Sequence, residues 1–144
     1  MKFSDIPGHD IAKSRLIAMA DSGRIPHALL IHGPKGIGKM SLARAFAQYV
    51  HCENRSNGDS CGCCPSCIQH QSFNHIDTHY VFPVVKKQKS RLTSDDYMAE
   101  WREFLTESPW MDFGRWLAAL DNMNAQPMIY VEESASLIRK LTYT

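Results

Sequence analysis

The sequence lacks any marked excess of charge of one sign and any long apolar run. Its 144 residues include 16 lysines and arginines and 15 aspartates and glutamates, which leaves a formal net charge of +1. A dedicated DNA-binding protein is usually far more basic, so composition alone does not indicate nucleic-acid binding. No apolar stretch approaches the roughly 20 residues that span a bilayer, and the start of the chain lacks the basic and apolar regions of a signal peptide. We therefore expect a cytoplasmic protein without a membrane segment.

Cysteine is absent outside residues 52–67, where all five cysteines of the chain lie. A secreted disulfide scaffold would spread its cysteines along the chain and would favour an even number. In a reducing cytoplasm, a tight cluster of cysteines more often holds a metal ion. The composition is otherwise ordinary for a globular protein, with 44% hydrophobic and 22% charged residues, and the length suits one domain.

The hydrophobic pattern predicts alternating helices and strands. An amphipathic helix is expected over 9–23, and the short apolar run 27–32 is typical of a buried parallel strand. A helix of good formers follows a glycine-rich turn, and 79–85 resembles a second strand. Further helices are expected at about 97–105, 113–120 and 132–141. This order predicts an α/β domain, a P-loop parallel sheet with flanking helices, which we expect to be incomplete at the C-terminus.

The glycine-rich turn reads GPKGIGK and fits the first seven positions of the phosphate-binding motif GxxxxGK[ST]. Glycines let successive backbone N–H groups curl around an anion, and the N-terminus of the following helix adds partial positive charge. A lysine at the position of Lys39 reaches the terminal phosphates. The candidate nucleotide-binding residues are Gly33, Pro34, Lys35, Gly36, Ile37, Gly38, Lys39, Met40 and Ser41.

The eighth position of the motif holds Met40, where serine or threonine normally binds the Mg²⁺ ion. A thioether cannot replace that hydroxyl for a hard cation. Ser41 lies one residue on, about 100° further round a helix, so it should not substitute directly. We favour a loop that keeps its shape without a nucleotide, and weak or metal-independent nucleotide binding stays open. Neither ATP nor Mg²⁺ is expected as a cofactor.

Four of the cysteines have the spacing of a structural zinc site. Cys52, Cys61, Cys64 and Cys67 give C-x8-C-x2-C-x2-C, and two residues between thiolates let a tight turn bring both sulfurs onto one ion. These four are the predicted Zn²⁺ ligands, which leaves Cys63 over. The alternative, a redox pair or free thiols, would leave this glycine-rich segment with nothing to order it. A site closed by four thiolates has no open position for water, so we expect a structural role.

Three histidines near the cysteines, His51, His70 and His75, are alternative ligands. We interpret each of them as a surface or packing histidine. The zinc prediction therefore uses only cysteine.

The segments GRIPHALLIHGPKGIGK, LARAFAQYVHC, CGCCPSC and NHID follow one another in this order. Together they resemble the clamp-loader ATPase-like subunits of bacterial DNA polymerase III, which are AAA+ proteins with a zinc module inserted after the P-loop helix. The resemblance is close over about 1–80 and looser over 125–141. It implies that 1–144 is the N-terminal part of an AAA+ P-loop domain, with the zinc module at about 52–75.

Two branches of that family share the pattern, the ATP-hydrolysing gamma/tau subunits and the delta-prime subunits. The hydrolysing branch has GKT in this loop and delta-prime often has a decayed motif, so Met40 favours the delta-prime branch. The resemblance then implies a non-hydrolysing subunit of the clamp-loader complex, with no catalytic residues and no activity of its own within a DNA-directed DNA polymerase holoenzyme. The implied partners are the gamma/tau and delta subunits and, through the complex, the sliding clamp and primed DNA.

The segment 83–124 lies outside the common family pattern and is interpreted as a lineage-type insertion. Its basic part, 86–91, is interpreted as a solvated loop rather than a contact to DNA phosphates. The three tryptophans, Trp101, Trp110 and Trp116, are predicted to be core residues rather than stacking platforms.

The family's lid and collar domains, with its acidic strand and arginine finger, would follow residue 144 and are expected to be absent from this chain. Two alternative functions stay open. One is an ATP-hydrolysing gamma/tau-type subunit in which Met40 is tolerated. The other is a zinc-dependent nucleic-acid-binding module with an incidental glycine loop, which would bind DNA in a salt-dependent manner.

Overall fold

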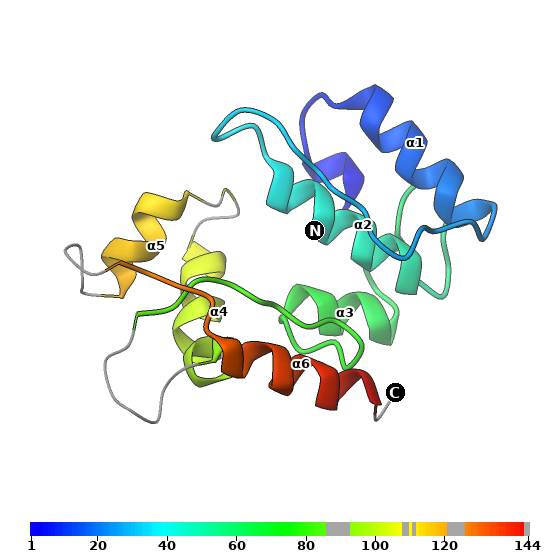
Figure 1. Ribbon diagram of the computed structural model, residues 1–144. Helices are drawn as coiled ribbons and strands as arrows, with labels where there is room; N and C mark the ends of the chain where they lie inside the picture. Colours follow the sequence, from blue (N-terminus) through cyan, green and yellow to red (C-terminus); the bar gives the residue numbers. More distant parts are fainter. Residues whose placement is uncertain (86–92, 108–109, 111, 121–125, 143–144) are drawn as a thin grey trace. The chain divides into compact units, whose positions relative to one another are not determined.

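The computed structural model describes residues 1–85, 93–107, 110, 112–120 and 126–142. These residues form two units, Met1–His75 and Ile76–Thr144. The helices of the first unit are η1 (Phe3–Asp5), α1 (Asp10–Asp21), α2 (Lys39–His51) and α3 (Pro65–Gln71) (Figure 1). The helices of the second unit are η2 (Ser94–Tyr97), α4 (Met98–Glu107), α5 (Phe113–Ala119) and α6 (Val131–Thr142).

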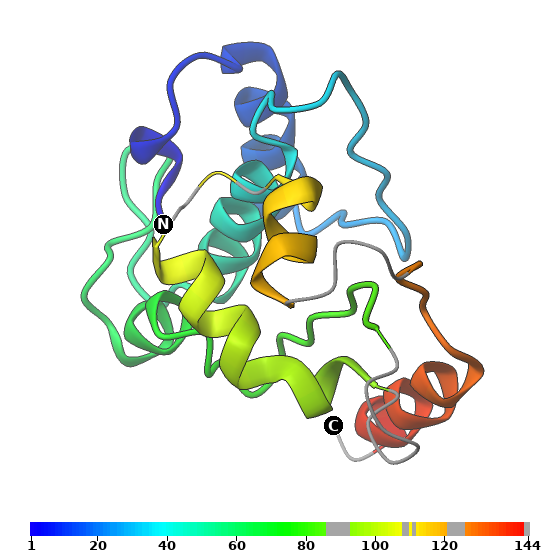
Figure 2. The same cartoon turned by 90° about the vertical axis from the view of Figure 1, so that its left-hand side faces the viewer.

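The first unit is built on α1 and α2, which lie side by side and are joined by the segment 22–38 (Figure 1, Figure 2). Both helices were predicted from the apolar periodicity and the good helix formers. Their facing sides share one apolar core with η1, to which the buried residues Phe3, Ile6, Leu16, Ala20, Leu42, Ala45 and Tyr49 belong. The hydroxyl of Tyr49 donates to Asp21 Oδ1 at 2.8 Å, which fastens the end of α2 to the end of α1.

The two predicted strands are wrong for this structure. Segments 27–32 and 79–85 have no strand, and the only β pairs among the described residues are two isolated bridges, Ser56 with Asp59 and Val84 with Met128. A strand is stable only where a neighbour completes its hydrogen-bond ladder, and an apolar run supplies side chains but no neighbour. Leu30, at the centre of 27–32, is 84% exposed instead of buried. The predicted parallel sheet is therefore not confirmed among the described residues.

The core of the second unit is an aromatic cluster around Trp101 and Trp116. Trp101 stacks on Phe82 with 4.1 Å between ring centroids and 12° between planes, and it meets Trp116 edge-on at 4.8 Å and 88°. The indole N–H of Trp116 donates to the carbonyl of Pro83 at 2.9 Å. Both rings are buried, as predicted, but Trp110 is 42% exposed and the prediction of a core role is wrong for it.

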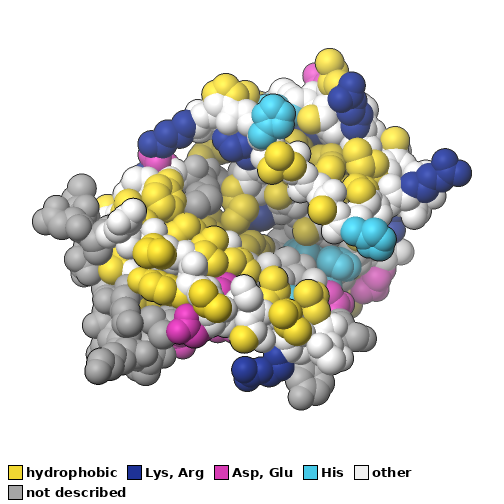
Figure 3. Space-filling model, in the orientation of Figure 1, with side chains coloured by type: hydrophobic (Ala, Val, Ile, Leu, Met, Phe, Trp, Pro, Cys, Tyr) yellow, Lys and Arg dark blue, Asp and Glu magenta, His cyan; other side chains and the backbone are white. Residues whose placement is uncertain are grey.

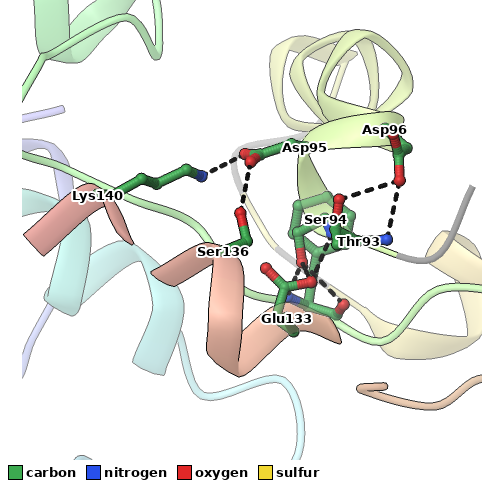
Figure 4. A network of polar contacts seen from close by, with 8 residues as sticks. Thr93, Ser94, Asp95, Asp96, Glu133, Ser136 and Lys140 are labelled. Carbon is green, nitrogen blue, oxygen red and sulfur yellow. Dashed lines mark hydrogen bonds and ion pairs between the residues drawn. The ribbon is translucent and has the colours of Figure 1, made fainter. Parts of the chain in front are cut away.

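Polar contacts fasten α6 within the second unit (Figure 4). The carboxylate of Glu133, in the first turn of α6, is buried and accepts hydrogen bonds from the backbone N–H and hydroxyl of Ser94 at 2.6 and 3.0 Å. One and two turns further along, Ser136 and Lys140 both donate to the carboxylate of Asp95. Helix α6 therefore binds its unit through carboxylates on both sides of the contact.

Apolar side chains remain exposed on α6. Val131, Ile138 and Leu141 are all exposed, and hydrophobic side chains are visible over α6 in Figure 3. The apolar pattern of the sequence predicts this helix but not its buried side. The residue of α6 that is buried is the charged Glu133.

Two expectations concern the rest of the chain. The basic segment 86–91 lies outside the described residues, so its interpretation as a solvated loop stays a prediction. None of the helices in the described part of the chain combines the length and apolarity that crossing a membrane requires.

Candidate metal centre and phosphate loop

The four predicted cysteine ligands converge on one point in the first unit. The sulfurs of Cys52, Cys61, Cys64 and Cys67 all lie within 4.8 Å of one another. The sulfurs of Cys52 and Cys61 are 3.6 Å apart, and those of Cys61 and Cys67 are 3.9 Å apart. A tetrahedral zinc site with Zn–S bonds of about 2.3 Å has sulfurs about 3.8 Å apart, so these residues fit the ion. Cys63 is exposed and lies outside the group.

Helices on either side of a short loop position the four sulfurs. Cys52 directly follows α2, Cys64 is the N-cap residue of α3, and Cys67 lies within α3, while Cys61 comes from the loop between the two helices. The backbone N–H of Cys61 donates to the sulfur of Cys52 at 3.2 Å, and that of Cys64 to the sulfur of Cys61 at 3.3 Å. Pro65 occupies the first position of α3, where a backbone N–H would have no partner within the helix, so proline is well tolerated there.

The thiols of the group differ in acidity. Hydrogen bonds from the backbone N–H groups of Cys63 and Cys64 lower the pKa of the Cys61 thiol to about 6. Burial raises the pKa of the Cys67 thiol to about 12. Donors aimed at sulfur favour the thiolate, which is the form that binds metal. A coordinated divalent ion deprotonates even a buried thiol, so the high pKa of Cys67 is compatible with a ligand role.

Residues that sequence reasoning missed hold the cysteine loop to the rest of the first unit. Asp59 accepts hydrogen bonds from the backbone N–H groups of Phe3 at 2.9 Å, Ser4 at 3.0 Å and Ser60 at 2.8 Å. The side-chain N–H of Gln48, buried on α2, donates to the Ser60 hydroxyl at 2.9 Å. No sequence motif indicates these contacts. The one signal for them is Gln48, a polar residue on the buried side of α2.

The structure also gathers the three histidines that were interpreted singly. His51 ends α2, His70 lies near the end of α3, and His75 follows α3. One ligand nitrogen of each lies within 4.8 Å of the others. Burial, together with the neighbouring His75 and His51, lowers the pKa of His70 to about 3, so its imidazole is neutral near pH 7.

The predicted phosphate-binding loop has a left-handed backbone at two of its glycines. Gly36 and Gly38 have φ of +79° and +88°, in the left-handed region that favours glycine, and α2 begins directly after Gly38. The ammonium group of Lys39 donates to the loop's own carbonyls, to Gly33 at 2.9 Å and to Pro34 at 2.7 Å. The lysine side chain therefore lies over the loop.

The two residues after Lys39 differ in burial. Met40 is partly exposed, whereas Ser41 is 1% exposed, so its hydroxyl is not presented to solvent beside the loop. The arrangement offers backbone N–H groups and one ammonium group for an anion, and it offers no hydroxyl in the position where a phosphate-bound Mg²⁺ ion would need one.

A sequence profile of the family described as "DNA polymerase III, delta subunit" matches residues 8–127. The chain belongs to this family. Curated relatives include the DNA polymerase III subunit gamma/tau of Mycobacterium tuberculosis (strain ATCC 25618 / H37Rv), 38% identical over 66 residues, which are 46% of this chain and 11% of the relative. The subunit tau of Escherichia coli (strain K12) is 33% identical over 75 residues, 52% of this chain and 12% of the relative.

A third relative, the subunit gamma/tau of Mycoplasma pneumoniae, is 31% identical over 99 residues, 69% of this chain and 14% of the relative. The chain thus spans 11% to 14% of the length of these relatives. No solved structure matches. The predicted membership of the clamp-loader family of DNA polymerase III is confirmed, but the family description names delta and the relatives are gamma/tau, so the comparisons do not choose between branches.

Proposed function

We propose that the chain is part of a delta-prime-type subunit of the DNA polymerase III clamp loader, one that does not hydrolyse ATP. In this role it contacts the ATP-binding gamma/tau subunits and the delta subunit. The complex places the sliding clamp on primed DNA in the cytoplasm. The observation that carries the proposal is Met40, which follows an otherwise complete phosphate loop in a member of this family.

The geometry of the loop supports an inactive nucleotide site. Met40 supplies no hard oxygen for Mg²⁺, and the hydroxyl of Ser41 is buried. The ammonium group of Lys39 already has two carbonyl partners within the loop, which a nucleotide phosphate would have to displace. An intact loop without its cation ligand suits a subunit that keeps the fold of its relatives and has lost the chemistry.

We further propose that Zn²⁺ is held by Cys52, Cys61, Cys64 and Cys67, with Cys63 outside the site. The ion would serve as a structural cross-link, because four thiolates leave no position for water or substrate. In this view the zinc module of about 52–75 and the insertion of about 83–124 are additions to the N-terminal part of an AAA+ domain.

The second candidate is an ATP-hydrolysing gamma/tau-type subunit, which is favoured by the similarity to gamma/tau and tau subunits. Titration calorimetry of the complete subunit with Mg·ATP separates the two. We expect no micromolar affinity in the natural protein or in Met40→Leu, which matches methionine in size without adding an oxygen. Met40→Thr, which restores the hydroxyl, should strengthen Mg²⁺-dependent binding. Micromolar, Mg²⁺-dependent binding by the natural protein would reject the delta-prime assignment.

A zinc-dependent nucleic-acid-binding module remains the third candidate. The net charge of +1 does not favour it, because phosphate contacts come from an excess of lysine and arginine. Salt-dependent binding of primed DNA by the isolated chain would support this candidate over the other two.

A further inference from the structure

Three histidines form a second group of metal-ligating atoms in the first unit, distinct from the four cysteines. Two of them lie on the helices that flank the cysteine loop: His51 ends α2 directly before Cys52, and His70 lies one helical turn after Cys67 in α3. His75 follows a few residues later. The ligand nitrogens of the three imidazoles lie within 4.8 Å of one another.

The contacts within the group are close and direct. Nδ1 of His51 lies 2.9 Å from Nε2 of His70, so one nitrogen donates a hydrogen bond to the other. The ring of His75 stacks on both other rings, with centroids 4.3 Å from His51 and 4.2 Å from His70. Nε2 of His75 lies 3.1 Å from the hydroxyl of Ser66, which fixes the orientation of that ring.

The chemistry of the group suits a borderline divalent ion. Neutral imidazole is a ligand for zinc, copper, iron and nickel, and sites with three protein ligands keep a fourth position open. Nitrogens bound at about 2.0–2.1 Å around a tetrahedral ion stand about 3.3–3.4 Å apart, so His51 and His70 would separate by about half an ångström. The three rings are stacked, with 19° to 23° between their planes, so binding one ion at a common point requires the imidazoles to turn about their side-chain bonds.

We propose that His51, His70 and His75 form a second, three-histidine site for a borderline divalent cation such as Zn²⁺, separate from the four-cysteine site. The ion takes the place of the proton that His51 and His70 share, and a water or an outside ligand completes its coordination. Three nitrogens bind zinc less tightly than four thiolates, so the cysteine site fills first and the histidine site second.

Cobalt provides the test, because its absorption spectrum distinguishes sulfur from nitrogen ligands. The full chain is loaded with one equivalent of Zn²⁺ and then titrated with Co²⁺. We expect one further equivalent to bind, with weak visible bands and without the intense charge-transfer absorption of a cobalt–thiolate bond. Binding seen only with the charge-transfer band, which would place Co²⁺ at the cysteines, or no binding up to millimolar Co²⁺ would overturn the proposal.

Histidine variants locate the second equivalent. His51→Gln and His75→Gln should each weaken Co²⁺ binding by at least about tenfold, since even the loss of an outer partner of a metal ligand typically costs 10–100-fold in affinity. His32→Gln, at an exposed histidine in the same unit, is the matched control and should bind as the natural chain does. All three should retain one equivalent of zinc by elemental analysis.

A second equivalent that survives in both cluster variants would show adventitious binding and reject the site. If either variant fails to fold, proton NMR of the natural chain with Co²⁺ decides instead. Imidazole N–H resonances shifted by the paramagnetic ion are expected from three rings, and the absence of such resonances overturns the proposal.

Discussion

The cysteine loop (52–64) and the glycine loop (33–38) of the first unit are both short, polar segments rich in glycine, but they are ordered in different ways. The cysteine loop contacts groups outside itself: its Asp59 carboxylate accepts from the backbone N–H groups of Phe3 and Ser4, and its sulfurs converge with that of Cys67. The glycine loop is exposed, and Lys39, the residue directly after it, donates to two carbonyls of the loop. The stability of the unit should therefore depend strongly on the first loop and weakly on the second.

The largest effect should follow the loss of a metal ligand. Cys64→Ser should abolish zinc binding at the cysteine site and destabilise the first unit by about 3 kcal/mol or more, because structural zinc sites supply roughly 10–16 kcal/mol of binding free energy to folding. Elemental analysis and chemical denaturation measure both changes. Cys63→Ser is the matched control and should keep about one equivalent of zinc. Loss of zinc in Cys63→Ser with retention in Cys64→Ser would show that Cys63, and not Cys64, is a zinc ligand.

Removing the carboxylate that anchors the cysteine loop should come next. Asp59→Ala leaves three backbone N–H groups without an acceptor, and we expect a loss of about 2–3 kcal/mol in the free energy of unfolding, since each unsatisfied donor costs about 1–3 kcal/mol and water satisfies part of them. Zinc should remain bound. Glu53→Ala, at an exposed carboxylate of the same loop, serves as the control in denaturant melts. An unfolding free energy unchanged in Asp59→Ala would show that the zinc ion alone orders the loop.

Backbone strain should have a smaller effect in the glycine loop. Gly36 has φ of +79° and open space where a Cβ would stand, so Gly36→Ala meets only the conformational penalty of about 1 kcal/mol. Thermal melts of the natural chain and of Gly36→Ala measure it. A loss comparable to that of Asp59→Ala would mean that the glycine loop contributes as much to the fold as the cysteine loop does.

The smallest effect is expected for the lysine of the glycine loop. Lys39→Ala removes two hydrogen bonds from an exposed ammonium group and should change stability by less than about 1 kcal/mol. In reconstituted clamp loading on primed DNA, the complete subunit with Lys39→Ala should work as well as one with Lys35→Ala. If Lys39→Ala abolishes loading while the complex stays intact, the phosphate loop binds nucleotide and the proposed function is wrong.

Local signals predicted the parts of the structure that depend on neighbours along the chain. The helices at Asp10–Asp21 and Lys39–His51 follow from periodicity and helix propensity, and the C-x2-C steps of the cysteine group follow from the reach of a tight turn. The strand at 27–32 failed because a strand needs a partner that no local pattern reveals.

Groups assembled from distant residues carried no such signal. His51 and His70 meet only because α2 and α3 pack together. Asp59 binds Phe3 and Ser4, which are 56 and 55 residues away in the sequence. The buried Glu133 of α6 is a further case, since a carboxylate in the first turn of a helix normally indicates an exposed position.

The distribution of the aromatic residues makes the two units spectroscopically distinct. All three tryptophans lie in the second unit, where Trp101 and Trp116 are buried and meet edge to face, whereas the cysteine and histidine groups lie in the first. Intrinsic tryptophan emission therefore reports on the second unit alone, with a blue-shifted component from the two buried rings. Following that emission while a chelator withdraws metal from the first unit reads out, in a single unlabelled sample, whether the unfolding of one unit is transmitted to the other.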